Sequence, residues 1–184
     1  DETLDVDAAM ATLDSWAATL AERVSADATS LQRLAALRQF MFEELGFRGD
    51  VHDYYSPENS LLHSVMDRRL GIPISLSAVY LLVAKRVQLP IVGIGMPAHF
   101  LCRFQTAMAE VYIDPFHRGQ LLTRLDCRKR LLESAIGYDE RHLAPLSSRR
   151  ILQRMIANLH LIHKERRNRT EADRLQRYLV ALSR

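Results

Sequence analysis

The chain has 184 residues, of which 48% are hydrophobic and 26% are charged, so it is long enough to bury one ordinary core and to carry a small appendage. No stretch approaches the roughly 18 consecutive apolar residues of a membrane span, and the acidic beginning, DETLDVDAAM, differs from a basic and then apolar secretory signal. Two cysteines, Cys102 and Cys127, are too few for a disulfide scaffold or a zinc site with paired thiolates. We therefore expect a globular cytoplasmic protein with reduced thiols and no membrane segment.

The net charge of +3 conceals an asymmetry between the two parts of the chain. Residues 1–60 hold 12 acidic and 4 basic side chains, a charge of −8, whereas residues 61–184 hold 10 acidic and 21 basic ones, a charge of +11. Such polarity can favour an acidic partner or contact between the two ends. No aromatic-interleaved basic groove or DNA-reading motif accompanies the charge, so nucleic acid is not the expected partner.

Three amphipathic helices are predicted before the centre of the chain. Apolar residues recur at helical spacing over 4–24, again over 29–45 up to Gly46, and again over about 58–69. A polar, turn-rich loop separates the second from the third, and Asn59 with Ser60 at its end is predicted to cap the third helix.

The next segment, 76–87, has almost no polar face, which predicts a helix buried on most sides. Short β-branched and aromatic segments follow at 91–96, 99–104 and 110–114, separated by turn signals. We expect them to form antiparallel strands that pack on the buried helix. Gly93 and Gly95 lack the further glycine and helix start of a dinucleotide fingerprint, so no such cofactor is expected.

From about residue 147 the sequence predicts two amphipathic helices, with Asn168 or Thr170 as the cap of the second. A single helical hairpin cannot bury its own apolar face and must dock on the main domain or on repeats outside this chain. Because the chain also begins without a methionine, the sequence suggests a piece of a longer protein.

Three separated residues could converge into a catalytic site. Ser75 stands at the head of the buried helix, where the helix dipole and free backbone N–H groups would favour an oxyanion. His99 falls on a predicted strand and Asp114 at the end of the next, so imidazole and carboxylate could meet as base and orienter.

Residues from about 38 to 131 resemble the bacterial SirB-like branch of the transglutaminase-like superfamily, which has a papain-like core. The resemblance rests on FEELGFRGD, YYSPENSLLHSVMDRRLGIPISLSAVYLLVAKRVQLP, GMPAHFLCRF and IDPFHRGQLL taken together. It implies that Ser75 lies at or beside the position of a nucleophilic cysteine, with His99 and Asp114 as its partners. It also implies tetratricopeptide-type helices after the core. Ala98 departs from the branch, which usually has glycine before the histidine; a positive φ there would restrict the backbone.

The expected fold is therefore α+β: a papain-like or transglutaminase-like core over 1–146, with its central helix buried against an antiparallel sheet, and a helical hairpin over 147–184. The leading functional prediction is a non-catalytic or weakly catalytic module of cytoplasmic regulation whose partner is another protein or a peptide. The alternative is a serine hydrolase or acyltransferase that acts on an amide or ester through Ser75, His99 and Asp114. Under the first prediction Ser75 is only a helix cap, and His99 with Asp114 is a structural pair.

The remaining candidates have simpler interpretations. Strand alternation turns Cys102 away from His99, so we interpret Cys102 as a small buried hydrophobe. His160 and His163 lie three apart on one helical face, but no third ligand recurs at an adjacent turn. The sequence alone therefore predicts neither a metal site nor a cofactor.

Overall fold

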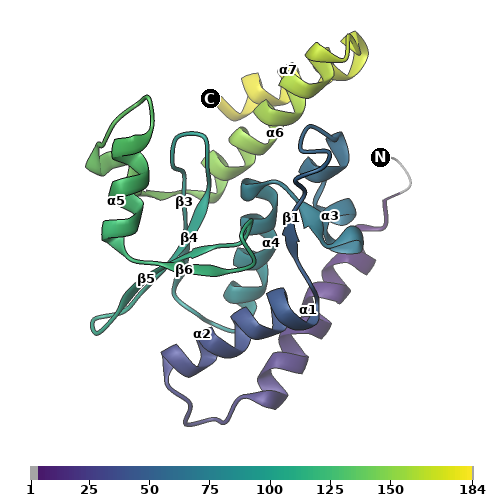
Figure 1. Ribbon diagram of the computed structural model, residues 1–184. Helices are drawn as coiled ribbons and strands as arrows, with labels where there is room; N and C mark the ends of the chain where they lie inside the picture. The colour runs from purple at the N-terminus through teal and green to yellow at the C-terminus, as the bar shows by residue number, and fades with distance from the viewer. Residues whose placement is uncertain (1–3, 184) are drawn as a thin grey trace.

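The computed structural model of the protein describes residues 4–183 and has the predicted α+β architecture (Figure 1). Helix α4 (Pro73–Arg86) lies in the middle, with α1 (Val6–Arg23) and α3 (Leu62–Arg68) to one side and a five-stranded sheet to the other. Both predicted domain ranges extend into ends outside this description, at residues 1–3 and at residue 184. No helix in the described part of the chain is both long enough and apolar enough to cross a membrane.

The first two predicted helices are present as α1 (Val6–Arg23) and α2 (Ser30–Gln39). Side chains cap both of them: Asp5 accepts the N–H of Ala8 at 2.9 Å, and Thr29 forms a capping box with Gln32. The range predicted as one helix, 29–45, changes at its end into a π-helical turn, η1 (Phe40–Glu44). Three consecutive apolar side chains, Phe40–Phe42, are buried there, which exceeds what one face of a regular α-helix can bury.

The third predicted helix, 58–69, is divided at Leu61 into a 3-10 turn, η2 (Pro57–Ser60), and α3 (Leu62–Arg68). The prediction that Asn59 and Ser60 cap this helix is wrong, because α3 begins after Leu61 and has no side-chain cap. Two short parallel strands, β1 (Arg48–Gly49) and β2 (Leu70–Gly71), tie the ends of this region together. The loop between them therefore starts and finishes beside the beginning of α4.

Helix α4 begins three residues before the predicted range, with Pro73 in its first turn, where a missing N–H costs nothing. Ten of its residues are buried, including Ser75 and Ser77. Lys85 and Arg86 occupy its last turn, as the favourable interaction of cations with the negative end of the helix predicts. The expectation of a helix buried on most sides is confirmed.

The sheet has the strand order β6-β5-β4-β3-β7, and all of its pairings are antiparallel. Its strands are β3 (Ile91–Ile94), β4 (Leu101–Gln105), β5 (Glu110–Asp114), β6 (Gln120–Leu122) and β7 (Pro145–Leu146). The predicted pairing of the second and third strands is confirmed, with Cys102 opposite Ile113. The placement of His99 on a strand is wrong: β4 begins two residues later, and His99 lies in the preceding loop.

Beyond the sheet come α5 (Arg124–Glu133), a 3-10 turn η3 (Glu140–Leu143), and the two helices of the tail, α6 (Ser148–Glu165) and α7 (Arg169–Ser183). The tail forms the predicted hairpin, and Asn168 caps α7 by accepting the N–H of Glu171 at 3.3 Å. It packs against the core through α6: Met155 joins a buried cluster with Phe100. In Figure 1 the hairpin lies along the top of the molecule, across the end of α4.

Candidate functional site

Ser75 is the third residue of α4, and its side chain is completely buried. The hydroxyl oxygen accepts the backbone N–H of Ile72 at 3.1 Å, as the side chain at position N3 of a helix does in a capping box. The hydroxyl proton has two acceptors within reach, the carbonyl oxygens of Asn59 at 2.5 Å and of Ile72 at 3.1 Å. The Ser75 side chain therefore closes the start of the helix and ties it to the η2 turn.

His99 and Asp114 form the predicted hydrogen bond, with His99 Nε2 and Asp114 Oδ2 2.9 Å apart. Asp114 ends β5 and has no exposed surface, while the imidazole of His99 is 19% exposed. Among the hydrogen bonds of the described residues, none joins Ser75 to His99. The structure thus brings together two of the three predicted site residues and directs the third elsewhere.

Two further side chains converge on the Asp114 carboxylate. His117 Nδ1 lies 2.9 Å and Arg130 Nη1 lies 3.0 Å from the same Oδ2 atom that His99 contacts. His117 lies in the turn after β5, and Arg130 projects from α5. Sequence reasoning missed both. The three-residue spacing from Asp114 to His117 could have indicated the first, because that spacing suits one turn.

The carboxylate of Asp114 has an unusual electrostatic environment. Burial alone would raise its pKa, but hydrogen bonds and charge interactions with His99 and His117 more than offset burial and hold the pKa below the usual range of an aspartate. Asp114 is therefore ionised at neutral pH and orients the surrounding donors.

The loop that carries His99 is held in a restricted conformation. Ala98 has a φ of 57°, the left-handed region that the sequence raised as a possible restriction beside His99. Arg154 of α6 donates to the carbonyl oxygens of Met96 at 3.3 Å and of His99 at 3.5 Å, and its guanidinium lies 5.4 Å from the centre of the Phe100 ring. The contacts of Arg154 therefore link the hairpin to the loop that carries His99.

A second polar cluster fixes the loop on which Ser75 depends. Asn59, fully buried, donates to Asp50 Oδ2 at 3.1 Å and to the carbonyl of Asp53 at 2.7 Å. Arg68 completes the cluster with hydrogen bonds to the Asn59 side-chain oxygen at 3.1 Å and to Asp50 Oδ2 at 3.2 Å. The side chain of Asn59 thus stabilises the loop, and its backbone carbonyl accepts a hydrogen bond from the Ser75 hydroxyl.

Both cysteines are buried thiols without a catalytic environment. Cys102 has no exposed surface and packs in the main core, and burial raises its pKa to about 12. Burial likewise raises the pKa of Cys127 to about 11. The interpretation of Cys102 as a small buried hydrophobe is confirmed.

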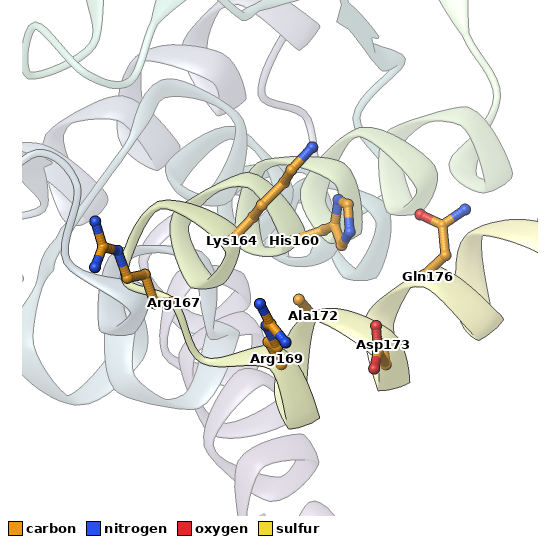
Figure 2. Close-up of a pocket in the computed structure, with 7 residues that line it drawn as sticks. All are labelled: His160, Lys164, Arg167, Arg169, Ala172, Asp173 and Gln176. Carbon is orange, nitrogen blue, oxygen red and sulfur yellow. The ribbon is translucent and has the colours of Figure 1, made fainter.

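Two hollows lie beside residues that the sequence analysis singled out or in the C-terminal hairpin. A small one of about 130 Å³ adjoins His99 and is bordered by Pro73, Phe100 and Arg154, whereas Ser75 is not among its lining residues. A larger one of about 670 Å³ lies in the C-terminal hairpin, and Figure 2 shows its side chains coming from α6, from α7 and from the turn between them. This hairpin hollow is lined by His160, Lys164, Arg167, Arg169, Ala172, Asp173 and Gln176.

Comparison with known proteins identifies the core. The family model for the transglutaminase-like superfamily matches residues 7–157. A UPF0162 protein of Xylella fastidiosa is 37% identical over 137 residues, which cover 71% of this chain and 49% of the relative. A UPF0162 protein of Pseudomonas aeruginosa is 36% identical over 149 residues, which cover 79% of this chain and 52% of the relative.

A eukaryotic relative shows that the same region occurs in a larger protein. The F-box only protein 21 of Mus musculus is 35% identical over 141 residues, which cover 70% of this chain but 21% of that protein. The chain thus spans about half the length of the bacterial relatives and about a fifth of the mouse one. The search of solved structures gave no significant match.

Proposed function

The chain belongs to the transglutaminase-like superfamily, and within that family we propose that it is a non-catalytic or weakly catalytic module of cytoplasmic regulation that binds another protein. The hairpin of α6 and α7 provides the binding surface. Its partner is a protein segment rich in acidic side chains.

The state of Ser75 carries the first half of the proposal. A serine nucleophile must give its proton to a base within about 2.6–3.2 Å, although apo structures can be looser. The proton of Ser75 has the carbonyl oxygen of Asn59 as its acceptor at 2.5 Å, and the hydroxyl oxygen already holds the N–H of Ile72. Attack on a substrate would break both bonds inside a fully buried region.

The hollow beside His99 supports the same conclusion. Ligand pockets commonly hold about 300–1,000 Å³, whereas this one holds about 130 Å³ and its lining does not include Ser75. An acyl donor placed against His99 would therefore not face the serine hydroxyl.

The hairpin hollow supports the second half of the proposal. Lys164, Arg167 and Arg169 are exposed around it, and Asp173 is its one acidic lining residue. Three cations beside a concave surface raise the local concentration of anionic segments and speed their association. Charge complementarity therefore favours an acidic protein segment as the occupant.

A labelling experiment tests the absence of serine catalysis. The native protein, with Ser75→Ala as the reference, is incubated with a fluorescent fluorophosphonate, which phosphonylates activated serines. We expect equal and negligible labelling of both proteins. Labelling that is specific to the native protein and is lost in Ser75→Ala would overturn this half of the proposal and support the hydrolase alternative.

A binding experiment tests the hairpin surface. Fluorescence anisotropy follows a peptide of alternating Asp, Glu and Leu, with a matched peptide in which Asn and Gln replace the acids. Lys164→Glu should weaken binding of the acidic peptide by roughly tenfold, because it turns an attractive charge into a repulsive one. Lys129→Glu is the matched control, since Lys129 is exposed on α5 and makes the same change in net charge. Equal weakening by both variants would show general electrostatics and would refute a hairpin site.

A further inference from the structure

The side chains of His99, Asp114 and His117 form a compact cluster of metal-binding groups. One ligand atom from each of the three lies within 4.8 Å of the other two. Asp114 Oδ2 is 2.9 Å from His99 Nε2 and 2.9 Å from His117 Nδ1. The geometry is therefore that of a carboxylate oxygen between two imidazole nitrogens.

These spacings are close to those of a bound transition metal. Bonds of about 2.0–2.2 Å from zinc to nitrogen and oxygen place neighbouring ligands of a tetrahedron roughly 3.3 Å apart. The two observed separations need to widen by only a few tenths of an ångström to match that spacing. Two histidines and one carboxylate also form the usual three-ligand set of sites that keep an open position.

The cluster is buried on one side and open to solvent on the other. Asp114 has no exposed surface, whereas the imidazole of His117 is 53% exposed, so an ion and its water can reach the group from solvent. The turn after β5 is closed by a hydrogen bond from the Gly119 N–H to the Asp114 carbonyl at 2.9 Å. Gly119 itself has a φ of 69°, which suits glycine.

We propose that His99, Asp114 and His117 form a binding site for a divalent transition metal of the zinc class. Asp114 supplies a carboxylate oxygen, His99 supplies Nε2 and His117 supplies Nδ1. Each neutral imidazole then carries its proton on its other ring nitrogen, so the ligand lone pairs face the ion. With the ion on Nε2 and the proton on Nδ1, His99 has no free lone pair with which to act as the base of the serine hydrolase alternative.

Arg130 competes with the metal for the carboxylate of Asp114. Its Nη1 atom lies 3.0 Å from Asp114 Oδ2, while its Nη2 atom lies 3.3 Å from Gln120 Oε1. The Arg130 side chain is 35% exposed, so its guanidinium can move toward solvent when a cation binds the carboxylate. Removing this positive charge should therefore strengthen metal binding.

The test uses calorimetry with Zn²⁺ and visible absorption with Co²⁺, both on protein first treated with a chelator. We expect one ion per chain and the d–d absorption of four- or five-coordinate Co²⁺. His117→Ala should weaken binding at least tenfold. Mutation of groups that only orient a metal ligand already lowers metal affinity about 10–100-fold, and His117 is proposed as a ligand itself. Arg130→Met should tighten binding severalfold.

Two controls make the result specific. His117 is half-exposed, so His117→Ala should keep the native fold, which circular dichroism verifies. His160→Ala removes one of the two histidines that lie three residues apart in α6 and should leave affinity unchanged. The proposal is wrong if neither ion binds, if His117→Ala binds as tightly as the native protein, if His160→Ala abolishes binding, or if Arg130→Met leaves affinity unaltered or lower.

Discussion

The replacement of Asp114 by alanine should destabilise the fold even if the protein catalyses nothing. The change removes the acceptor shared by His99, His117 and Arg130. His99 is 19% exposed, so the loss of its partner leaves a largely buried donor, which costs about 1–3 kcal/mol. His117 and Arg130 are 53% and 35% exposed and regain water, so together they add less than about 1 kcal/mol. The expected loss in the free energy of unfolding is therefore roughly 1–4 kcal/mol.

Urea unfolding followed by circular dichroism measures this loss, with a chelator present so that bound metal does not contribute to stability. For a chain of this length the corresponding fall in Tm is roughly 2–16 °C. Asp173→Ala is the matched control, because Asp173 is exposed on α7 and its loss should change stability by no more than about 0.5 kcal/mol. If Asp114→Ala unfolds at the same urea concentration as the native protein, the carboxylate does not hold its three donors together in the way described.

Three other measurements follow from the same structure. Ser75→Ala should lower the free energy of unfolding by about 1–3 kcal/mol in urea, since it leaves the buried N–H of Ile72 without its acceptor; unchanged stability would contradict the capping role. Ala98→Gly should raise thermal stability by up to about 1 kcal/mol, because relief of the left-handed φ exceeds the added entropy of the unfolded chain; a lower Tm would show that the conformation is not strained. Because the pKa of Asp114 is lower in the folded protein than its unfolded value of 3.8, ionisation of Asp114 stabilises the fold at pH values above 3.8. This stabilisation is lost as the pH falls from 3.8 toward the folded pKa. The stability difference between native protein and Asp114→Asn should therefore shrink between about pH 4 and pH 2 in urea titrations, and a constant difference would contradict it.

The parts of the fold that sequence could predict are those set by local pattern. Helix α4 was predictable because a 12-residue run without a polar face must be buried. A second kind of inference came from the family resemblance, which predicted the pairing of His99 with Asp114 even though His99 lies in the loop before β4 and not on the strand.

The parts that sequence missed depend on backbone details or on groups that converge from separate elements. Whether Ser75 faces solvent or its own helix depends on where α4 begins, and Pro73 moves that start three residues earlier than the apolar pattern predicted. Arg130 reaches Asp114 only because α5 packs beside β5 and β6, a tertiary contact that no local spacing encodes. His117 was within reach of a local argument through its turn, yet its role depends on the place of His99 in three dimensions.

The hairpin is in direct contact with the candidate site, although the sequence pattern changes near residue 147. Arg154 of α6 holds the carbonyl oxygens of Met96 and His99, and burial lowers the pKa of its guanidinium without a carboxylate to oppose the change. Hydrogen bonds from a partly buried cation to backbone carbonyls are among the stronger ones in proteins. Phe100, next to His99, packs in turn against Met155 of the same helix. A displacement of α6 relative to the sheet would strain the contacts that position the His99 loop, and His99 would transmit that strain to the cluster around Asp114 through its hydrogen bond.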